Sequence, residues 1–217
     1  NEQTIKIVQI DYVNGNIWPN PYEIDWNSVN TILDAAQPVD GLWKLEGDTV
    51  RTAVPGYDRL LAIGDLTWDD YEITVPITYH GRMSSGNSPG LGILMRWQGH
   101  LGDRDPRIEW SGVIGWYRFS SGGYLQLLGS KSLDMEDFDS LKLSTGNRYI
   151  YKMRVETTSD QRGRYSLKVW KDGDPVPDSW QLVGVEDSSN NQTGSLLLLA
   201  HRLDASFGRV TIVPVED

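Results

Sequence analysis

The chain has 217 residues and a formal net charge of -10, with 39% hydrophobic and 23% charged residues. This composition fits one folded domain with a full core, and it excludes global disorder. The negative charge, without a long basic run, argues against nucleic acid and anionic membranes, and it disfavours polyanionic polysaccharides unless a local Arg cluster overrides it. The absence of cysteine excludes disulfides and thiol catalysis. No apolar run is long enough for membrane insertion.

The N-terminal segment has an irregular pattern. β-Branched residues predict a strand over residues 4–12, and an Asn-Gly-Asn turn ends it. Residues 25–36 carry apolar side chains at helical spacing, but their Thr, Val and Asn content leaves an extended segment equally open. We therefore treat residues 1–39 as an arm with one strand that precedes the body of the protein.

From residue 40 onward, short strand patterns recur at intervals of about 8–12 residues. Their predicted ranges are 43–46, 49–53, 59–63, 70–79, 92–100, 108–119, 122–126, 149–156, 164–170, 181–186, 194–201 and 207–215. Residues 130–145 are acidic and are predicted to form an irregular loop. No alternation of strands and helices is present, which argues against a parallel sheet. The pattern is typical of a single all-β domain, a sandwich or a barrel, over residues 1–217 with its body at 40–217.

The stretch 92–126 carries the strongest functional signal. Side chains of a strand alternate between the two faces of a sheet, so Ile93, Met95 and Trp97 are predicted to lie in the core. The opposite face collects cationic, amide and aromatic side chains: Arg96, Gln98, His100, Trp116, Arg118, Tyr124 and Gln126. Such a mixture is typical of a sheet that binds a sugar, although a solvated outer face can carry the same residues. Of the aromatic residues, Trp110, Trp116 and Tyr124 are expected to be accessible.

Five segments in this order resemble the concanavalin A-like (laminin G-like) jelly-roll superfamily over residues 40–215. They are Gly92-Ile93-Leu94-Met95-Arg96-Trp97, Gly115-Trp116-Tyr117-Arg118-Phe119, residues 148–155, residues 165–173 and residues 205–212. The resemblance implies a two-sheet antiparallel jelly-roll β-sandwich with one concave sheet. Its members include lectin-like and carbohydrate-binding modules, adhesion domains, glycoside hydrolases and polysaccharide lyases, so the fold alone does not settle the function.

The same superfamily raises the question of a metal. Members often carry an Asp after the aromatic residue that opens the last strand, and some bind calcium nearby. Here Gly208 follows Phe207, so a structural calcium ion would need other oxygen donors, such as Asp48 and Asp204. No other cofactor is implied.

Two enzyme hypotheses can be tested against the residues. Asp134 and Glu136 have the spacing of a glycosidase pair, but their acidic surroundings favour a solvated loop. A lyase is suggested by Gln98-Gly99-His100 and Arg107-Ile108-Glu109, which resemble alginate-lyase-type motifs in reversed order. It would use His100 and Tyr124 as acid and base, with Gln98 and Arg107 at the uronate carboxylate. The other two histidines, His80 and His201, are predicted to be polar surface or edge residues.

The sequence thus predicts a non-catalytic carbohydrate-binding or adhesion module of an extracellular protein, secreted or at the cell surface. Its start at Asn1, without an export signal, suggests a mature chain or an excised module. The partner would be a polysaccharide or glycan on the concave sheet, with Arg107, Glu109 and Trp110 at the rim of the site. One alternative is a lyase acting on a uronate polymer. A second is a structural module that binds no ligand and supports neighbouring domains, which an apolar patch on the outer sheet would favour.

Overall fold

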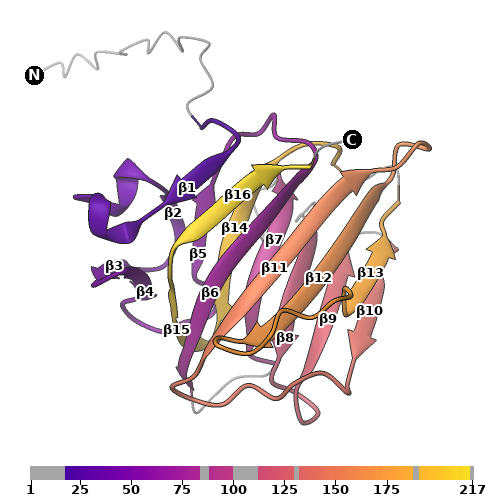
Figure 1. Cartoon of the computed structure of the whole chain (residues 1–217). Coiled ribbons are helices and arrows are strands. Elements are labelled where there is room, and N and C mark those ends of the chain that lie inside the picture. Colours follow the sequence, from indigo (N-terminus) through magenta and orange to yellow (C-terminus); the bar gives the residue numbers. More distant parts are fainter. Residues whose placement is uncertain (1–17, 84–87, 100–111, 130–131, 188–190, 216–217) are drawn as a thin grey trace, which may run out of the picture.

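The computed structural model describes residues 18–83, 88–99, 112–129, 132–187 and 191–215, and it shows two antiparallel sheets packed face to face (Figure 1). Sheet A contains, in order, β13 (Leu182–Val185), β12 (Gly163–Lys171), β11 (Arg148–Thr157), β6 (Tyr71–Arg82), β15 (Leu203–Phe207), β4 (Thr49–Thr52) and β3 (Trp43–Glu46). In this sheet β6 also pairs with β16 (Val210–Pro214), which pairs with β1 (Tyr22–Ile24). Sheet B contains β10 (Asp134–Asp137), β9 (Tyr124–Gly129), β8 (Val113–Arg118), β7 (Gly90–Trp97), β14 (Ser195–His201), β5 (Leu60–Ile63) and β2 (Gln37–Asp40). No helix of the described residues is long and apolar enough to cross a membrane.

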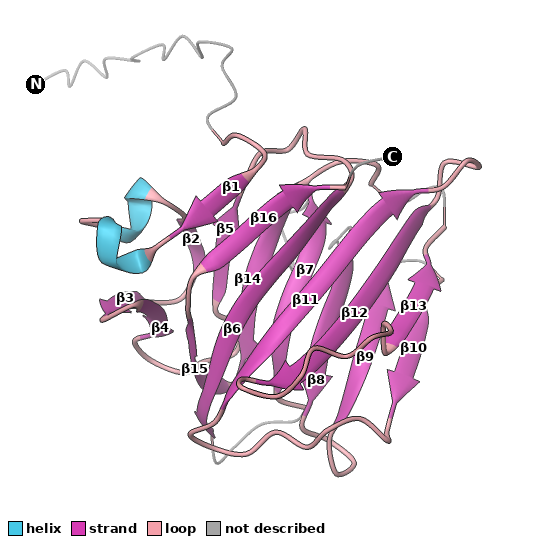
Figure 2. Cartoon of the chain, in the orientation of Figure 1, coloured by secondary structure: helices cyan, strands magenta, loops and turns pink. Residues whose placement is uncertain are grey.

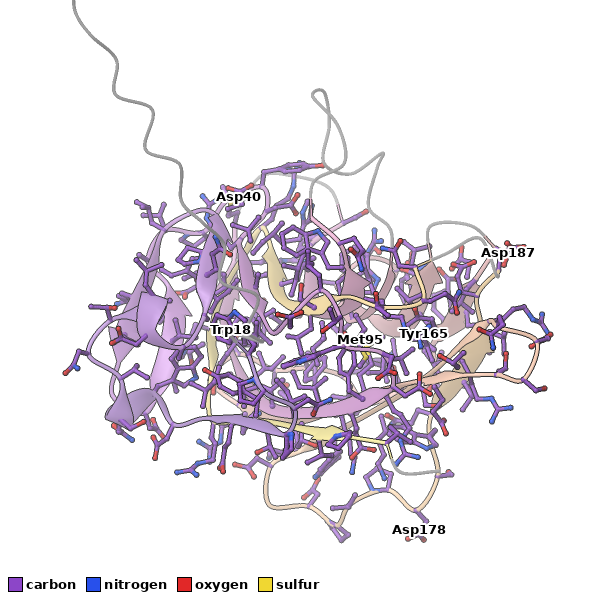
Figure 3. All side chains as sticks on the ribbon, turned by 90° about the horizontal axis from the view of Figure 1, so that it is seen from above. Trp18, Asp40, Met95, Tyr165, Asp178 and Asp187 are labelled. Carbon is purple, nitrogen blue, oxygen red and sulfur yellow. The ribbon has the colours of Figure 1, made fainter. Side chains whose placement is uncertain are left out.

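The core lies between the two sheets, where strand alternation places apolar side chains from both. In β6 every second residue from Tyr71 to Tyr79 points toward the core, and all of these side chains are buried. Figure 3 looks along the layers and shows Met95 of sheet B and Tyr165 of sheet A between them. The sheets approach closely at Gly115, where an added Cβ would lie 2.7 Å from the Met153 sulfur. A larger residue there would push the sheets apart.

The N-terminal arm was predicted for residues 1–39, and its described part, residues 18–39, contributes strands to both sheets of the sandwich. Its strand β1 pairs with β16 in sheet A, and its strand β2 pairs with β5 in sheet B. The strand predicted over residues 4–12 lies outside the described residues. The helix considered for residues 25–36 is replaced by two short 3-10 turns, η1 (Trp26–Ser28) and η2 (Ile32–Asp34) (Figure 2). Trp26 explains the break, because its buried indole donates to the Gly208 carbonyl at 2.8 Å and anchors the chain there.

Two other segments differ from the sequence prediction. The acidic loop expected at residues 130–145 contains the edge strand β10, which pairs with β9. An edge strand with one solvated face accepts carboxylates at alternate positions, so Asp134 and Glu136 do not prevent it from forming. The strand expected at residues 207–215 is the shorter β16 (Val210–Pro214), and the strand β15 (Leu203–Phe207) before it was not predicted; the two pair with different parts of the long β6.

A bulge at the end of β7 reverses the predicted faces of Arg96 and Trp97. Arg96 has a positive φ of 57°, and the pairing of β7 with β14 shifts register so that Ser195 lies opposite Trp97 and Leu196 opposite Met95. An extra residue in a strand bends it and changes the face on which the following side chains lie. The prediction that Arg96 lies on the outer face is therefore wrong, and so is the placement of Trp97 in the core between the sheets.

The bulge gives Arg96 a structural position between the sheets. Its side chain is fully buried, and its guanidinium donates to the Asp70 carboxylate at 2.8 Å and to the Thr157 hydroxyl at 2.6 Å. Asp70 precedes β6, and Thr157 ends β11, so both partners belong to sheet A. The ion pair thus joins the ends of the two sheets.

Candidate functional site

The surface of sheet B that points away from the core is called here the outer face. Its centre is an apolar floor of eight buried residues: Leu60, Ala62, Leu94, Trp97, Ile114, Trp116, Leu197 and Leu199. Polar side chains lie toward its two ends. The end nearest Trp116 and the end nearest Trp97 differ in their chemistry.

At the Trp116 end, the structure brings together four of the residues singled out from the sequence: Trp116, Arg118, Tyr124 and Gln126. Glu136, Gln126 and Trp116 lie directly opposite one another on β10, β9 and β8. The Gln126 amide is central, since its oxygen accepts from the Trp116 indole at 2.9 Å. Its nitrogen donates to Asp134 at 2.8 Å and to Glu136 at 3.3 Å. Both hydrogen-bonding groups of Gln126 are therefore occupied by the protein.

The Trp116 and Tyr124 rings at this end are not accessible, contrary to the sequence prediction. Each is only 7% exposed. The Arg118 guanidinium lies 4.4 Å from the centre of the Trp116 ring, and Phe138 stacks on Tyr124 at 4.5 Å. The Trp116 ring also lies over Gly90 of the neighbouring strand β7, which has no side chain: a Cβ there would be 2.5 Å from the ring. This end is a closed polar and aromatic network.

At the Trp97 end, a cleft of about 340 Å³ opens beside β7 and β5. Its volume is within the range of small-ligand sites. It is lined by Trp18, Gln37, Ala62, Gly64, Asp65, Leu66, Trp97, Gln98, Gly99 and Ser195. Of these, only Gln98 was proposed as a ligand-binding residue from the sequence.

The polar and aromatic walls of this cleft are held by local hydrogen bonds. The Asp65 carboxylate accepts from the backbone N–H and the hydroxyl of Thr67, at 2.9 and 2.8 Å. The Gln98 amide nitrogen donates to the carbonyl and the hydroxyl of Thr193, at 2.9 and 3.0 Å. Trp18 is fixed through its carbonyl, which accepts from the Trp68 indole at 3.1 Å. These bonds orient the walls before any ligand arrives.

The lyase hypothesis required Gln98 and Tyr124 to act on one sugar linkage, and the register separates them. Tyr124 lies opposite Arg118, which lies opposite Gly90 at the start of β7. Gln98 follows the last residue of β7, so the two are eight positions apart along the strand direction. At the usual rise per residue this is roughly 26 Å. The other members of the set, His100 and Arg107, lie outside the described residues, as do Glu109 and Trp110.

His201 forms a pair that the sequence did not indicate. Its Nδ1 lies 2.6 Å from the carboxylate of Asp58, a residue that is only 3% exposed. Its Nε2 lies 3.1 Å from the Arg202 Nε, which can only donate. Nε2 therefore accepts, and Nδ1 carries the proton that is donated to Asp58. With both ring nitrogens engaged, His201 is a structural link and not an available base.

The residues named for calcium do not fit a metal ion. Asp204 is bound by Arg51 through both carboxylate oxygens, at 2.9 and 2.7 Å. Burial raises the pKa of the Asp204 carboxyl, but the hydrogen bonds and charge of Arg51 outweigh burial, so the pKa lies below its usual value. Asp48 lies in the exposed turn between β3 and β4. Within the described residues no cluster of three or more His, Asp or Glu side chains could hold a metal.

No protein-family model matches this chain, and no curated protein matches it in sequence. Solved structures do match. The Emp46p carbohydrate recognition domain in a metal-free form is 13% identical, with a TM-score of 0.61 over 92% of this chain and 99% of that chain. The alginate lyase Aly36B is 11% identical, with a TM-score of 0.61 over 92% and 100% of the two chains. The VIP36 exoplasmic/lumenal domain with Ca²⁺ and Man3GlcNAc bound is 12% identical, with a TM-score of 0.55 over 85% and 86%.

The chain has the concanavalin A-like jelly-roll fold. The fold expected from the sequence is therefore confirmed. The similar structures include a carbohydrate recognition domain and an alginate lyase, so the jelly roll serves both binding and catalysis among them. At these identities they establish the fold alone, and the function of this jelly roll has to be argued from its own residues.

Nine of the ten lining residues of the cleft were missed by the sequence, among them Trp18, Gln37, Asp65 and Trp97. Trp97 was assigned to the core because strict alternation ignores the bulge at Arg96. Trp18, Gln37 and Asp65 come from segments that are distant in the sequence: Gln37 is on β2, which pairs with β5, Asp65 follows β5, and Trp18 precedes β1 of sheet A. The Asp-Leu-Thr sequence at residues 65–67 was a usable signal, because Asp before a nearby Thr is typical of a turn with a fixed carboxylate.

Proposed function

We propose that this jelly roll is a non-catalytic glycan-binding module of an extracellular protein, and that the cleft at the Trp97 end of the outer face holds the sugar. The cleft itself is the observation that carries the proposal. It combines the partly exposed Trp18 and the largely buried Trp97 with Gln37, Asp65 and Gln98 in one concave space. Aromatic rings provide apolar contact with polar edges, and amides and carboxylates form hydrogen bonds with hydroxyl groups.

The alternatives receive less support. A lyase built on Gln98 and Tyr124 would have its residues at opposite ends of the outer face. The carboxylates of Asp134 and Glu136 do share a face, but both are bonded to Gln126, and neither lines the cleft. A structural module would be favoured by an exposed apolar patch on the outer sheet. The eight residues of the apolar floor are each at most 8% exposed, so among the residues that the structure describes this floor gives that alternative no support.

A calorimetric titration with a panel of neutral and uronate oligosaccharides tests the proposal, with ultraviolet absorbance recorded in parallel for unsaturated lyase products. We expect binding of at least one glycan without a rise in absorbance. Trp18→Ala should weaken this binding by about tenfold or more, because truncation of an aromatic anchor is typically the most costly change in a binding site. The ring of Trp18 is partly exposed and packs against Tyr22 at 5.4 Å, so its loss should cost some stability, but the hydrogen bond from Trp68 goes to the backbone carbonyl and remains, so the fold should survive.

The matched control is Trp180→Ala. Trp180 lies close to Arg154 and Lys168 of sheet A, with those cations 5.4 and 5.1 Å from its ring, and it does not line the cleft. It should leave glycan affinity unchanged. Equal losses in the two variants, or no loss in Trp18→Ala, would contradict the cleft as the binding site. A rise in absorbance with the wild-type protein would contradict the non-catalytic function.

A further inference from the structure

The cleft has a donor and acceptor pattern that bears on which sugars it can hold. Three of its polar side chains have hydrogen-bond donors that are already committed or absent. Asp65 carries only acceptors, the Gln98 amide nitrogen is used by Thr193 and Leu66, and the Ser195 hydroxyl donates to the Trp97 carbonyl at 3.2 Å. What these three side chains can still offer a ligand is their oxygen atoms, so they need donors from it.

The charge of the cleft has the same consequence. Asp65 is the one charged side chain among the described residues that line it. The whole chain has a formal charge of -10, which adds a background field of the same sign. A carboxylate on a sugar that lies beside Asp65, Gln98 and Ser195 would be an acceptor facing acceptors and a negative charge facing a negative charge, and the donors of the cleft are the Gln37 amide and the Trp18 indole.

From this pattern, and resting on the proposed glycan-binding function, we propose that the cleft selects sugars rich in hydrogen-bond donors. It binds neutral hexoses and amino sugars and rejects uronic acids. A hydroxyl group donates to Asp65 and to the oxygens of Gln98 and Ser195. An ammonium group does the same and adds an opposite charge beside Asp65. A uronate keeps its ring hydroxyl groups but carries a carboxylate in place of the donating hydroxyl at C6, which adds repulsion beside Asp65 at short range, where the effective dielectric constant is low.

The test uses three tetrasaccharides with one β-1,4-linked gluco backbone, made of glucose, glucosamine or glucuronate units, and a matched pair made of mannose or mannuronate. Dissociation constants are measured by calorimetry at neutral pH and low salt. We expect each uronate to bind about tenfold or more weakly than its neutral counterpart, as like charges at close range predict. Glucosamine should bind at least as tightly as glucose.

The substitution Asp65→Asn tests whether this side chain causes the preference for neutral sugars over uronates. Asn can keep the turn with Thr67, because its side-chain oxygen accepts the same hydrogen bonds, and melting temperatures should remain close. In this variant the ratio of neutral to uronate affinity should fall to about threefold or less, since the charge is removed. An unchanged ratio would contradict the assignment to Asp65.

Failure of this inference can be told apart from failure of the proposed function. If a uronate binds as tightly as its neutral counterpart, and Trp18→Ala weakens both, the cleft is a glycan site but the donor-selective inference is wrong. If none of the five tetrasaccharides binds, both proposals are overturned.

Discussion

The two ends of the outer face of sheet B show the difference between residues that share a face and residues that form an open site. At the Trp116 end the strands are regular, and alternation places Trp116, Arg118, Tyr124 and Gln126 together. These groups bind one another, and the aromatic rings are covered. At the Trp97 end a bulge breaks the alternation, and a cleft with aromatic and polar walls opens there. Bulges are common next to active sites, where they redirect side chains, and here the bulge places Trp97 on the side of the cleft.

Substitution of Arg96 is expected to have the largest effect on stability. Arg96 lies at the bulge of β7 that makes the two ends of the outer face different. Arg96→Ala should lower the free energy of unfolding by about 3 kcal/mol, because it breaks an ion pair in which the Arg side chain is fully buried. Arg118→Ala, a half-buried cation at the other end, should cost less than about 1 kcal/mol. Urea denaturation measures both. Similar small losses in the two variants would mean that Arg96 lies on the surface after all.

Substitution of one glutamine at each end of the outer face separates the effects on stability from those on glycan binding. Gln126→Ala should lower the free energy of unfolding by about 1–2 kcal/mol, because the Trp116 indole N–H loses its acceptor in a buried position. It should leave glycan affinity unchanged. Gln98→Ala should weaken glycan binding by about tenfold, with a loss of stability below about 1 kcal/mol.

Denaturation and calorimetry on both glutamine variants provide the check. Loss of affinity in Gln126→Ala, with normal affinity in Gln98→Ala, would move the site to the Trp116 end.

The smallest expected effect is on the pH dependence of stability. It involves His80 of sheet A, away from both ends of the outer face. Burial, followed by the charge of Arg51, lowers the pKa of His80, whose Nε2 lies 2.9 Å from the Ser206 hydroxyl. With the folded pKa below the unfolded value of about 6.5, this contribution to stability is present above that value and is lost as pH falls through the folded pKa. His80→Gln should therefore reduce the fall in stability between pH 7 and pH 5. Unfolding curves at the two pH values measure this, and an equal fall in both proteins would contradict it.

The sequence predicts the parts of the fold that depend on local pattern. In β6 and β11 the side chains alternate strictly because one face of each strand is in the core, and both strands lie where they were predicted. The bulge at Arg96 depends on partners 26 and 61 positions away, Asp70 and Thr157, so no local pattern reveals it. The cleft likewise joins residues from positions 18, 37, 65 and 97. Its composition could be read only after the strand order of sheet B was known.

The most direct test of the central claim is a two-dimensional nitrogen–proton spectrum of the nine tryptophan indole groups during titration with a bound neutral oligosaccharide. Single Trp→Phe substitutions assign the signals. We predict that the Trp18 and Trp97 signals shift in proportion to occupancy, while the Trp116 signal stays in place. A shift confined to Trp116 would place the ligand at the other end of the outer face and contradict the account.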